Sequence, residues 1–425
     1  MAKKTPAVII VGGGLAGLTC AVKLHEAEVP FLLLEASDRF GGRVTSDRYE
    51  NFILDRGFQV LLTAYPEAKQ MLDYSKLGLH DFYPGALVYK GGKLHKLADP
   101  FRHPIDAISS ALSPIGSFAD KMLVGKVRQL LTSTSLEKIF EKPETTTEKA
   151  LLDYGFSPLM IDCFFRPFFG GIFLDRKLTT SSRMFDFVFR MFAEGASALP
   201  ARGMAAIPDQ LVARLPAASI RTKAHVRNVQ EGFVILDDGD TMAAPVVVVA
   251  TEGPEAARLL GEEVQLTPAK SVLCTYYAAQ KPPFEEPILV LNGEGTGCVN
   301  NVCVPSNVSR SYAPEGQYLI SVSVLGNRDE DEDREIDEEI RKDLTPWFGA
   351  QVQSWRYLKS YKIKYALPDQ SPPQLATPQR PVKLKPGIYL CGDHRDNASI
   401  NGAMASGRRT AEAVLKEFKS EDKVG

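Results

Sequence analysis

The sequence predicts an α/β fold in which a parallel sheet with its helices is interrupted by an inserted α+β domain. The first observation is the stretch VIIVGGGLAGLTCAVKL, residues 8–24, where an apolar strand passes through closely spaced glycines into residues with helical periodicity. The second is that buried, strand-like segments return at 246–250 and 387–391, after stretches with a different pattern. We therefore expect the chain to leave its first sheet and to re-enter it.

The glycines of the first stretch have the spacing of a dinucleotide-binding turn. Gly12 permits a tight turn, Gly14 lets a phosphate approach the backbone, and Gly17 lets helix and strand pack closely. The first amides of the helix would then face a pyrophosphate. Glycine-rich turns also arise for steric reasons alone, but a second strand, Pro30–Glu35, completes a βαβ unit. Glu35 ends that strand at the place where a carboxylate accepts hydrogen bonds from a ribose, so a dinucleotide is favoured over a surface acid.

Composition places the chain among globular proteins of two or three domains. Its 425 residues are 44% hydrophobic and carry a formal net charge of −2 without a basic stripe, which argues against a nucleic-acid partner. The six cysteines are scattered without metal-ligand spacing, so we expect no metal site and a reducing, cytoplasmic setting. The first seven residues are too short for a signal peptide, and no apolar run approaches the roughly 20 residues that span a bilayer.

The pattern changes several times after the βαβ unit. A hairpin with a Gly-Gly turn is predicted over residues 86–97, and a helical tract with several prolines follows over 101–192. Short strands resume after Gly203, and one acidic helix is predicted over 328–343. Its apolar face consists of Ile336, Ile340, Leu344 and Trp347.

These changes predict two domains, both discontinuous in sequence. The dinucleotide-binding domain comprises residues 1–80, 200–265 and 380–425. The substrate domain comprises residues 81–199 and 266–379, and the helical tract belongs to it.

Three further stretches place glycines beside charged residues at strand ends. Residues 35–43, EASDRFGGR, put a Gly-Gly pair between Arg39 and Arg43. Residues 54–59, LDRGFQ, and residues 387–393, GIYLCGD, each end a strand near a glycine. The last is followed by SINGAMASG at 399–407, a small-residue helix start whose amides suit an anionic or electron-rich group.

These stretches, in this order, resemble the superfamily of flavin-containing amine oxidases, phytoene desaturases and protoporphyrinogen oxidases. The resemblance covers nearly the whole chain: GxGxxG at 12–17, the acid and GGR at 35–43, Asp-x-Gly at 55–57, the strand at Val226, VVVAT at 247–251 and the C-terminal GD…SINGA. It implies an FAD-binding Rossmann-like domain of the glutathione-reductase type with an inserted α+β substrate domain. It also identifies the expected dinucleotide as FAD.

The resemblance implies roles for single residues. The first loop would bind the pyrophosphate, Glu35 the adenosine ribose, Arg43 a phosphate, Val226 the adenine through its backbone, and Asp393 the ribityl or pyrophosphate region. Gly57 to Val60 and Ser399 to Asn401 would flank the isoalloxazine. The full predicted set is Gly12, Gly13, Gly14, Leu15, Ala16, Gly17, Glu35, Ala36, Arg39, Gly42, Arg43, Gly57, Phe58, Gln59, Val60, Val226, Gly392, Asp393, Ser399, Ile400 and Asn401.

The expected mode of flavin attachment follows from one difference between this sequence and the covalent members of the superfamily. Its covalent members attach the flavin through a cysteine somewhat upstream of the final strand, and residues 361–390 contain none. We therefore expect non-covalent FAD.

The substrate chemistry is less constrained by motifs, because FAD itself accepts the hydride. The resemblance places aromatic rings over the flavin from the segment before the last strand, so Tyr365 is the candidate catalytic residue, with Tyr361 near it and a core tyrosine as the alternative. Lys270 resembles a lysine that some amine oxidases hold near the flavin, and a surface lysine is the simpler interpretation. Arg166 stands among phenylalanines, where an unpaired charge is costly, and is a candidate anchor for a carboxylate.

Three functions stay open. The leading one is an FAD-dependent desaturase or dehydrogenase that takes hydride from an apolar small molecule, such as a polyene or a polycyclic compound. The second is an amine oxidase that uses O2, and the third is a flavin-binding protein without turnover. Because no second nucleotide loop is visible, the expected electron acceptor is O2, a quinone or another protein.

A segment of the helical tract has the pattern of a membrane-surface helix. Phe101, Ile105, Ile108 and Leu112 recur at helical spacing beside Arg102 and His103. Packing against the helical domain produces the same periodicity, so the sequence leaves peripheral membrane contact as one of two interpretations.

Overall fold

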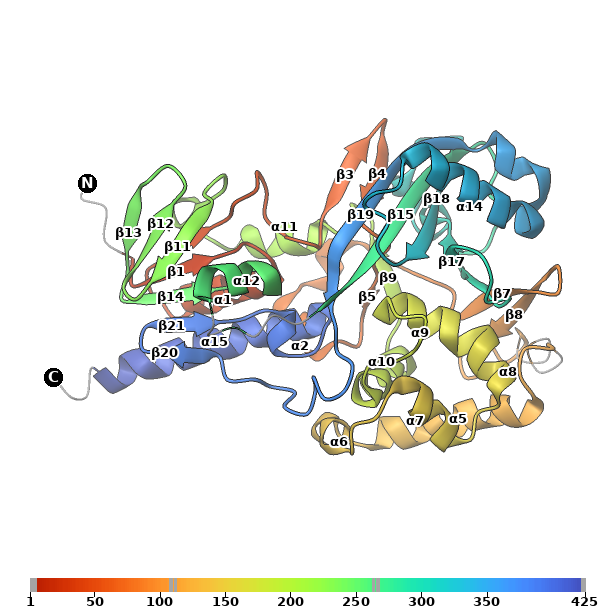
Figure 1. Cartoon of the computed structure of the whole chain (residues 1–425), viewed down its shortest axis with the longest axis horizontal. Coiled ribbons are helices and arrows are strands. Elements are labelled where there is room, and N and C mark those ends of the chain that lie inside the picture. Colours follow the sequence, from red (N-terminus) through yellow and green to blue (C-terminus); the bar gives the residue numbers. More distant parts are fainter. Residues whose placement is uncertain (1–5, 107–109, 111–112, 262–263, 265–267, 422–425) are drawn as a thin grey trace.

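The computed structural model describes residues 6–106, 110, 113–261, 264 and 268–421. Its first part is a six-stranded sheet in the order β10-β2-β1-β14-β21-β20. The strands are β10 (Ile220–Arg221), β2 (Phe31–Leu34), β1 (Val8–Val11), β14 (Val246–Val249), β21 (Ile388–Leu390) and β20 (Lys383–Lys385). The first five are parallel, and β20 runs antiparallel to β21 at the edge. The chain thus enters this sheet from three separate stretches of sequence (Figure 1).

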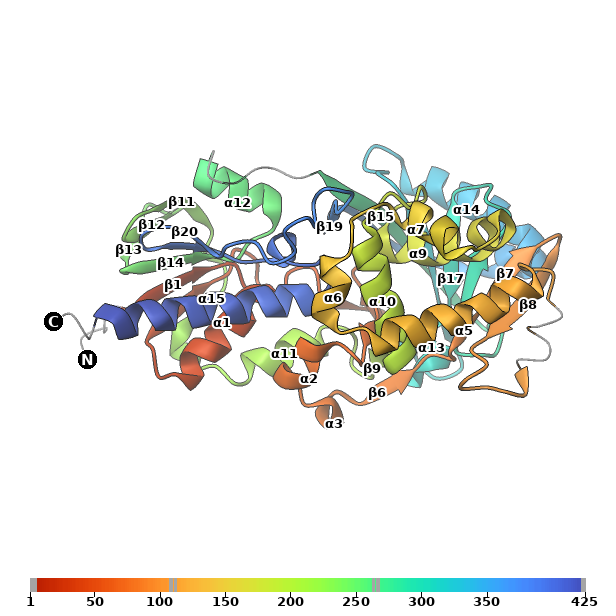
Figure 2. The ribbon, with the colours of Figure 1, turned by 90° about the horizontal axis from the view of Figure 1, so that it is seen from below.

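Alternate residues of β1 face opposite sides of this sheet, and because all four are apolar, both faces of the strand are buried. Ile9 and Val11 pack under α12 (Gly253–Leu260) and a small sheet of β11 (Val226–Gln230), β12 (Phe233–Leu236) and β13 (Thr241–Ala243). Val8 and Ile10 belong to the main core, with α1 (Leu15–Glu26) and α15 (Ile400–Glu421). These two helices lie alongside each other (Figure 2). Their approach is close, because a Cβ on Gly407 would lie 2.1 Å from the carbonyl oxygen of Ala16.

The second part is built on a seven-stranded sheet in the order β19-β15-β18-β17-β16-β7-β8. Its strands are β19 (Arg356–Pro368), β15 (Ala269–Ala279), β18 (Tyr318–Leu325), β17 (Val299–Cys303), β16 (Leu289–Asn292), β7 (Gly85–Lys90) and β8 (Lys93–Ala98). The β16–β7 pair is parallel and the other pairs are antiparallel. The long strands β15 and β19 reach from this sheet toward the first part (Figure 1).

One face of the seven-stranded sheet is covered by α14 (Asp333–Phe348). The predicted apolar face of this helix is present, since Ile336, Ile340 and Leu344 are buried against the sheet. Trp347 is partly buried and stacks on Tyr89 of β7 at a centroid distance of 5.1 Å. The acidic residues occupy the outer face, so the helix begins five residues later than predicted but packs as expected.

Helices cover another side of the second part. They are α5 (Phe118–Ser133), α6 (Leu136–Glu141), α7 (Thr147–Tyr154), α8 (Pro158–Met160), a π-helical turn (Ile161–Phe165), α9 (Arg166–Phe173) and α10 (Ser182–Glu194). Phenylalanines of α9 and α10 form a cluster, with Phe169 and Phe185 4.7 Å apart between ring centroids. Both rings are buried, so most of the aromatic density in this tract forms core.

Two short sheets complete the connection between the parts. One pairs β3 (Ser46–Tyr49) with β4 (Phe52–Asp55), and the other has the order β5-β9-β6, with β5 (Leu61–Leu62), β9 (Ser197–Pro200) and β6 (Leu79–Asp81). Short helices α2 (Pro66–Met71), α3 (Tyr74–Leu77), α11 (Ala206–Val212) and α13 (Pro305–Val308) lie between strands.

The membrane-helix pattern at 101–112 is described only in part. Residues 101–105 form turns and not a helix, and Ile108 and Leu112 lie outside the described residues. Ser117 and Asp120 form a capping box at the start of the helix α5, which begins at Phe118. No helix in the described part of the chain is long and apolar enough to cross a bilayer.

Candidate functional site

A large cavity extends from the carboxyl ends of the first sheet to the wall formed by β19, α9 and α10. Its volume is about 990 Å³, which is near the upper end for small-molecule sites. The end at the first sheet is called the dinucleotide end here, and the other the substrate end.

The loop between β1 and α1 forms the first wall of the dinucleotide end. Gly12 has a φ of +107°, and a Cβ there would lie 2.7 Å from the carbonyl oxygen of Ala250, so this turn requires glycine. A Cβ on Gly17 would lie 2.0 Å from the carbonyl oxygen of Gly12. At Gly14, in contrast, a Cβ would meet no protein atom within 4 Å, because this residue borders the cavity. The first amides of α1 are therefore accessible to an anion.

Glu35 fixes this loop from the end of β2. Its Oε2 accepts a hydrogen bond from the amide of Gly13 at 2.7 Å, and its Oε1 accepts one from the amide of Ser37 at 2.8 Å. Glu35 also borders the cavity, as do Ala36 and Val226. Because each carboxylate oxygen has a further lone pair, Glu35 can hold the loop and still accept from a ligand hydroxyl.

The Gly-Gly-Arg stretch lies directly against the first loop. The amide of Gly41 donates to the carbonyl oxygen of Gly13 at 2.8 Å, and a Cβ on Gly42 would lie 3.3 Å from the Cα of Gly14. Arg43 then crosses to the other wall, with Nη2 2.6 Å from Asp393 Oδ1 and Nη1 donating to the carbonyl oxygen of Ala366 at 2.9 Å. One cation thus joins three stretches that are far apart in the sequence.

The C-terminal stretch brings the start of α15 to the cavity. Gly392 and Asp393 follow β21, and Ser399 and Ile400 follow after a short loop; all four border the cavity. Ser399 caps the helix, because its Oγ accepts from the amide of Gly402 at 3.0 Å. The positive end of a 22-residue helix is therefore directed at the cavity.

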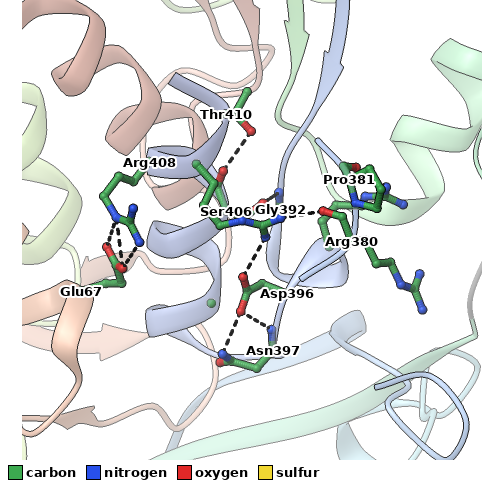
Figure 3. Close-up of polar contacts among 12 residues, drawn as sticks. Glu67, Arg380, Pro381, Gly392, Asp396, Asn397, Ser406, Arg408 and Thr410 are labelled. Carbon is green, nitrogen blue, oxygen red and sulfur yellow. Dashed lines mark hydrogen bonds and ion pairs between the residues drawn. The ribbon is translucent and has the colours of Figure 1, made fainter. Parts of the chain in front are cut away.

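Buried polar contacts hold this loop in place (Figure 3). Asp396 accepts from the amide of Asn397 at 2.9 Å and pairs with Arg409 at 3.1 Å, and burial raises the pKa of Asp396 to about 6. Glu67 of α2 receives Arg408 of α15 through three hydrogen bonds of 2.6 to 3.1 Å. These contacts fix the N-terminal part of α15 before any ligand binds.

The hydroxyl of Thr251 is a buried polar group at the dinucleotide end. Its Oγ1, two residues after β14, has no hydrogen-bond partner among the described residues, and Thr251 borders the cavity. Buried hydroxyls are normally satisfied, so a ligand group is the natural partner. Together with the open side of Gly14, this orphaned atom fits a bound dinucleotide such as FAD.

The substrate end is mostly apolar. Its lining includes Phe58, Phe168, Ile172, Leu174, Met184, Val188, Phe192, Val272, Leu289, Tyr361, Ile363 and Tyr365. Only a few phenylalanines of the helical tract reach it, namely Phe168 and Phe192. Asn301 and Ser323 add a small polar patch from the sheet, joined by a hydrogen bond of 3.3 Å.

The structure brings most of the predicted site residues to this cavity. Those that border it are Gly12, Gly13, Gly14, Leu15, Ala16, Glu35, Ala36, Gly42, Arg43, Gly57, Phe58, Gln59, Val60, Val226, Gly392, Asp393, Ser399, Ile400 and the candidate catalytic residue Tyr365.

Three predicted cofactor residues do not border it. Gly17 packs against the turn, and the side chain of Asn401 is directed to the backbone amide of Glu67 at 3.0 Å. Arg39 pairs with Asp47 at 2.7 Å on the outer side of the Gly-Gly turn. The Gly-Gly pair turns the backbone between the two arginines, so that only Arg43 reaches the cavity.

The ion pairs in the structure correct two expectations about charged residues of the substrate domain. Arg166 lies 2.6 Å from Glu148 and 3.0 Å from Asp162 and does not border the cavity, so it is no substrate anchor. Lys270 is mostly buried rather than a surface lysine, and its ammonium lies 3.4 Å from Asp369.

Sequence reasoning missed other residues of the cavity. Thr251 had a visible signal, because it follows the carboxyl end of a parallel strand, where ligands bind in such sheets. Arg56 and Lys359 had none, since nothing in LDRGF or in the cation-rich RYLKSYKIKY indicates which cation borders a cavity. In the described part of the chain, no group of three or more His, Cys, Asp or Glu side chains could hold a metal.

Comparison with known proteins assigns the chain to a family. The sequence profile described as "Flavin containing amine oxidoreductase" matches residues 15–415. A Dictyostelium discoideum protein described as a probable flavin-containing monoamine oxidase A is 30% identical over 131 residues, which are 26% of this chain and 28% of that protein. Coproporphyrinogen III oxidase of Mycobacterium tuberculosis is 22% identical over 285 residues, 59% of this chain and 60% of that enzyme.

Solved structures show the same fold over nearly the whole chain. An oxidoreductase from Methanosarcina mazei superposes with a TM-score of 0.76 at 17% identity, covering 95% of this chain and 99% of that one. The alignments with the two curated relatives, in contrast, span less than two thirds of each relative's length.

Proposed function

The chain belongs to the flavin-containing amine oxidoreductase family, and from this premise we propose that it is an FAD-dependent oxidoreductase acting on an apolar substrate such as a polyene or a polycyclic compound. The observation that carries the proposal is the continuity of the cavity. Its dinucleotide end is built from glycine backbone and helix N-termini, and it opens directly into an end lined by aliphatic and aromatic side chains.

FAD, when bound, supplies the ring that accepts a hydride. The residues of this chain bind and orient it. Gly12, Gly13, Gly14 and the start of α1 would hold the pyrophosphate, Glu35 would accept from the ribose, and Arg43 would neutralise a phosphate. The backbone of Val226 would contact the adenine, and Asp393 the ribityl or pyrophosphate region. Gly57 to Val60, Ser399 and Ile400 would flank the isoalloxazine.

The walls of the substrate end serve two further purposes. The phenylalanines and aliphatic residues exclude water from the reacting groups, which protects the reduced flavin and binds an apolar substrate. Tyr365 presents its ring to the substrate. In this role it contributes contact area and orientation, not a proton.

The test is anaerobic reduction of the bound flavin, which is monitored through the loss of the flavin's visible absorbance. We expect reduction by coproporphyrinogen III or by a polyene such as phytoene, and not by putrescine or benzylamine. Reduction by an amine alone would overturn the proposal in favour of an amine oxidase that uses O2, which the likeness to a monoamine oxidase favours. Bound flavin that none of these compounds reduces would contradict catalysis on any of these substrates and indicate a flavin-binding protein.

Non-covalent attachment of FAD is part of the proposal. All six cysteines are unpaired and buried, and none borders the cavity. Burial raises the pKa of Cys391, within the final Gly-Asp stretch, to about 12, so its thiol is not nucleophilic. Acid precipitation should therefore release all the flavin into the supernatant, and flavin that stays with the precipitate would refute this part.

We propose O2, a quinone or another protein as the electron acceptor. The second glycine-rich stretch, Gly293 to Gly297, is a turn between β16 and β17 and starts no helix, so it does not have the form of a nicotinamide loop. Rapid anaerobic reduction of the flavin by NADPH would contradict this choice.

A cytoplasmic, membrane-peripheral location completes the proposal. Five large apolar side chains are exposed on and beside α5: Phe101, Ile105, Phe118, Met122 and Leu130. Arg128 lies over the ring of Phe101 and Lys126 is exposed, so cations accompany these apolar side chains. The helix α5 itself lies on the outer side of the helical layer (Figure 2). An anionic lipid surface satisfies both features.

Co-sedimentation with phosphatidylserine vesicles tests the membrane contact. Replacing Phe101 and Ile105 together by Asp should abolish binding while flavin content stays unchanged. The substitution Leu152→Asp, at another exposed leucine on α7, is the matched control and should not affect binding. A wild-type protein that fails to bind at low salt would exclude the contact.

A further inference from the structure

Charge is unevenly distributed along the cavity. The carboxylates among its described lining residues are Glu35, Glu252, Glu255 and Asp393, all in segments of the dinucleotide end. The loop between β4 and β5 and strand β19, which supply part of the apolar lining, also contribute four cations to it, Arg56, Lys359, Lys362 and Lys364, and no carboxylate among the described lining residues. A site for a cationic amine would need the opposite distribution.

Two of these cations, Arg56 and Lys359, share one carboxylate just outside the lining, that of Asp47 on β3. Asp47 lies 2.7 Å from Arg39, 3.1 Å from Arg56 and 3.9 Å from Lys359. The hydroxyl of Tyr361 also donates to it at 2.8 Å. Although burial opposes ionisation, hydrogen bonds from Arg56, Tyr361 and Arg39 lower the pKa of Asp47 to about 2. Asp47 therefore faces three cations, of which Arg39 also pairs with Asp38 at 3.4 Å.

The surplus charge resides on Arg56 and Lys359. Arg56 uses Nε and Nη2 on Asp47, at 3.1 and 3.3 Å, and its Nη1 has no hydrogen-bond acceptor among the described residues. The ammonium of Lys359 also lacks an acceptor at hydrogen-bond distance within the described chain, and it lies 4.9 Å from the centre of the Tyr361 ring. Lys362 differs, because its ammonium donates to the carbonyl oxygen of Asp331 at 2.6 Å and lies 3.2 Å from Asp333.

We propose that Arg56 and Lys359, held by Asp47, bind a carboxylate of the otherwise apolar substrate. This inference rests on the proposed function, and it narrows the substrate to an apolar acid. Asp47 and Tyr361 are positioning residues: Asp47 orients the guanidinium edge-on, and Tyr361 fixes Asp47. A carboxylate placed between the two cations gains charge-assisted hydrogen bonds at the edge of an apolar cavity, where they are stronger than in bulk water.

A carboxylate site at Arg56 and Lys359 also predicts selectivity against amines. A substrate ammonium would enter beside two cations with only one shared carboxylate to offset them, and like charges at such distances repel. A neutral substrate would leave the two cations hydrated at the rim of the cavity. Its binding free energy would come only from contacts with the apolar walls.

The experiment compares three probes with one apolar chain and different head groups: decanoate, decan-1-ol and decylamine. Binding to the purified FAD-loaded protein is followed by calorimetry and by the shift of the flavin spectrum. We expect decanoate to bind most tightly and decylamine most weakly. Arg56→Ala and Lys359→Ala should each weaken decanoate about 10- to 100-fold and leave decan-1-ol unchanged.

Lys362→Ala is the matched control, because it removes the same charge from the same strand at an ammonium with its own partners. It should change decanoate binding less than about twofold, since its charge is already compensated. Lys359→Arg should retain the preference for decanoate, and Lys359→Glu should shift it toward decylamine.

Two results would overturn the anchor. One is equal affinity of the wild-type protein for decanoate and decylamine, and the other is an equal loss of decanoate binding in Lys362→Ala and Lys359→Ala. Failure of the proposed function gives a different result: a protein that purifies without flavin, or whose flavin no substrate reduces, and that still prefers decanoate in the calorimeter.

Discussion

The two ends of the cavity are built in different ways. At the dinucleotide end, the walls are backbone: the turn at Gly12, the Gly41-Gly42 pair and the amides at the start of α1 and α15. At the substrate end, the walls are side chains from β19, α9, α10 and the β4–β5 loop. A backbone wall needs particular residues at particular spacings, whereas a side-chain wall needs only the correct volume and polarity. Substitutions should therefore act in different ways at the two ends.

The largest effect is expected at Gly14. Its φ of −73° suits any residue, and a Cβ there meets no protein atom within 4 Å, so Gly14→Val should fold. The added side chain occupies the space beside the amides of α1, and FAD affinity should fall about 100-fold or more, about 3 kcal/mol. The measurement is the ratio of flavin to protein after purification, with circular dichroism to verify folding.

Gly17→Val is the matched control for Gly14→Val. Its Cβ would lie 2.0 Å from the carbonyl oxygen of Gly12, so it should destabilise the protein itself and lower its melting temperature. If Gly14→Val retains full flavin content, the loop does not bind a pyrophosphate.

The next largest effect is expected on stability, at Asp55 in the junction between the two parts. Asp55 of β4 is buried, and its carboxylate accepts from Ser46 at 2.6 Å, from the amide of Met204 at 2.9 Å and from the hydroxyl of Tyr312 at 2.9 Å. Burial raises its pKa to about 6, since desolvation outweighs these hydrogen bonds. The raised pKa means that the protonated form is favoured by folding.

The pH dependence follows from this sign. The stabilisation by protonated Asp55 is complete below the unfolded-state pKa of about 3.9 and is lost as the pH rises through the folded-state pKa of about 6. The free energy of unfolding should therefore fall by about 2 kcal/mol between pH 4 and 7. Asp55→Asn should flatten that part of the profile, measured by urea unfolding at several pH values. The exposed Asp81→Asn should leave the profile unchanged, and an equally flat profile in both variants would refute the assignment.

Glu35 comes third in expected effect. Glu35→Ala removes the acceptor for the ribose and also the bond to the Gly13 amide, so FAD affinity should fall by about 1 to 3 kcal/mol. Titration of the apoprotein with FAD measures this loss. FMN, which lacks the adenosine, is the control ligand: an equal loss for FMN would mean that Glu35 acts only by holding the loop.

The contrast between the two ends explains what the sequence could reveal. Gly12 and Glu35 were predicted from local spacing, and Gly42 and Asp393 from the family resemblance of their stretches; all four border the cavity. Arg56 and Lys359 were not, because they meet only through Asp47, and nothing in either stretch indicates that contact.

Arg166 shows the opposite error. Its aromatic neighbours indicated a buried, unpaired charge, yet Asp162 stands one helical turn before it and Glu148 comes from α7. The spacing to Asp162 was visible in the sequence and should have lowered the expectation of a substrate anchor. The return of the chain to the first sheet was easier to predict, because fully apolar parallel strands such as 246–249 are distinctive.

The smallest effect concerns two tyrosines of β19. It distinguishes a side chain that only forms part of the cavity wall from one that takes part in the chemistry. The hydroxyl of Tyr361 donates to Asp47, whereas that of Tyr365 has no partner among the described residues and its ring is 38% exposed. If Tyr365 contributes only its ring, Tyr365→Phe should change the rate of flavin reduction less than twofold, and Tyr365→Ala should lower it about 3- to 10-fold. Tyr361→Phe should instead weaken decanoate binding, because Asp47 loses a donor. A large loss of rate in Tyr365→Phe would mean that its hydroxyl takes part in the chemistry, and the substrate end would then resemble the dinucleotide end in requiring one particular group at one position.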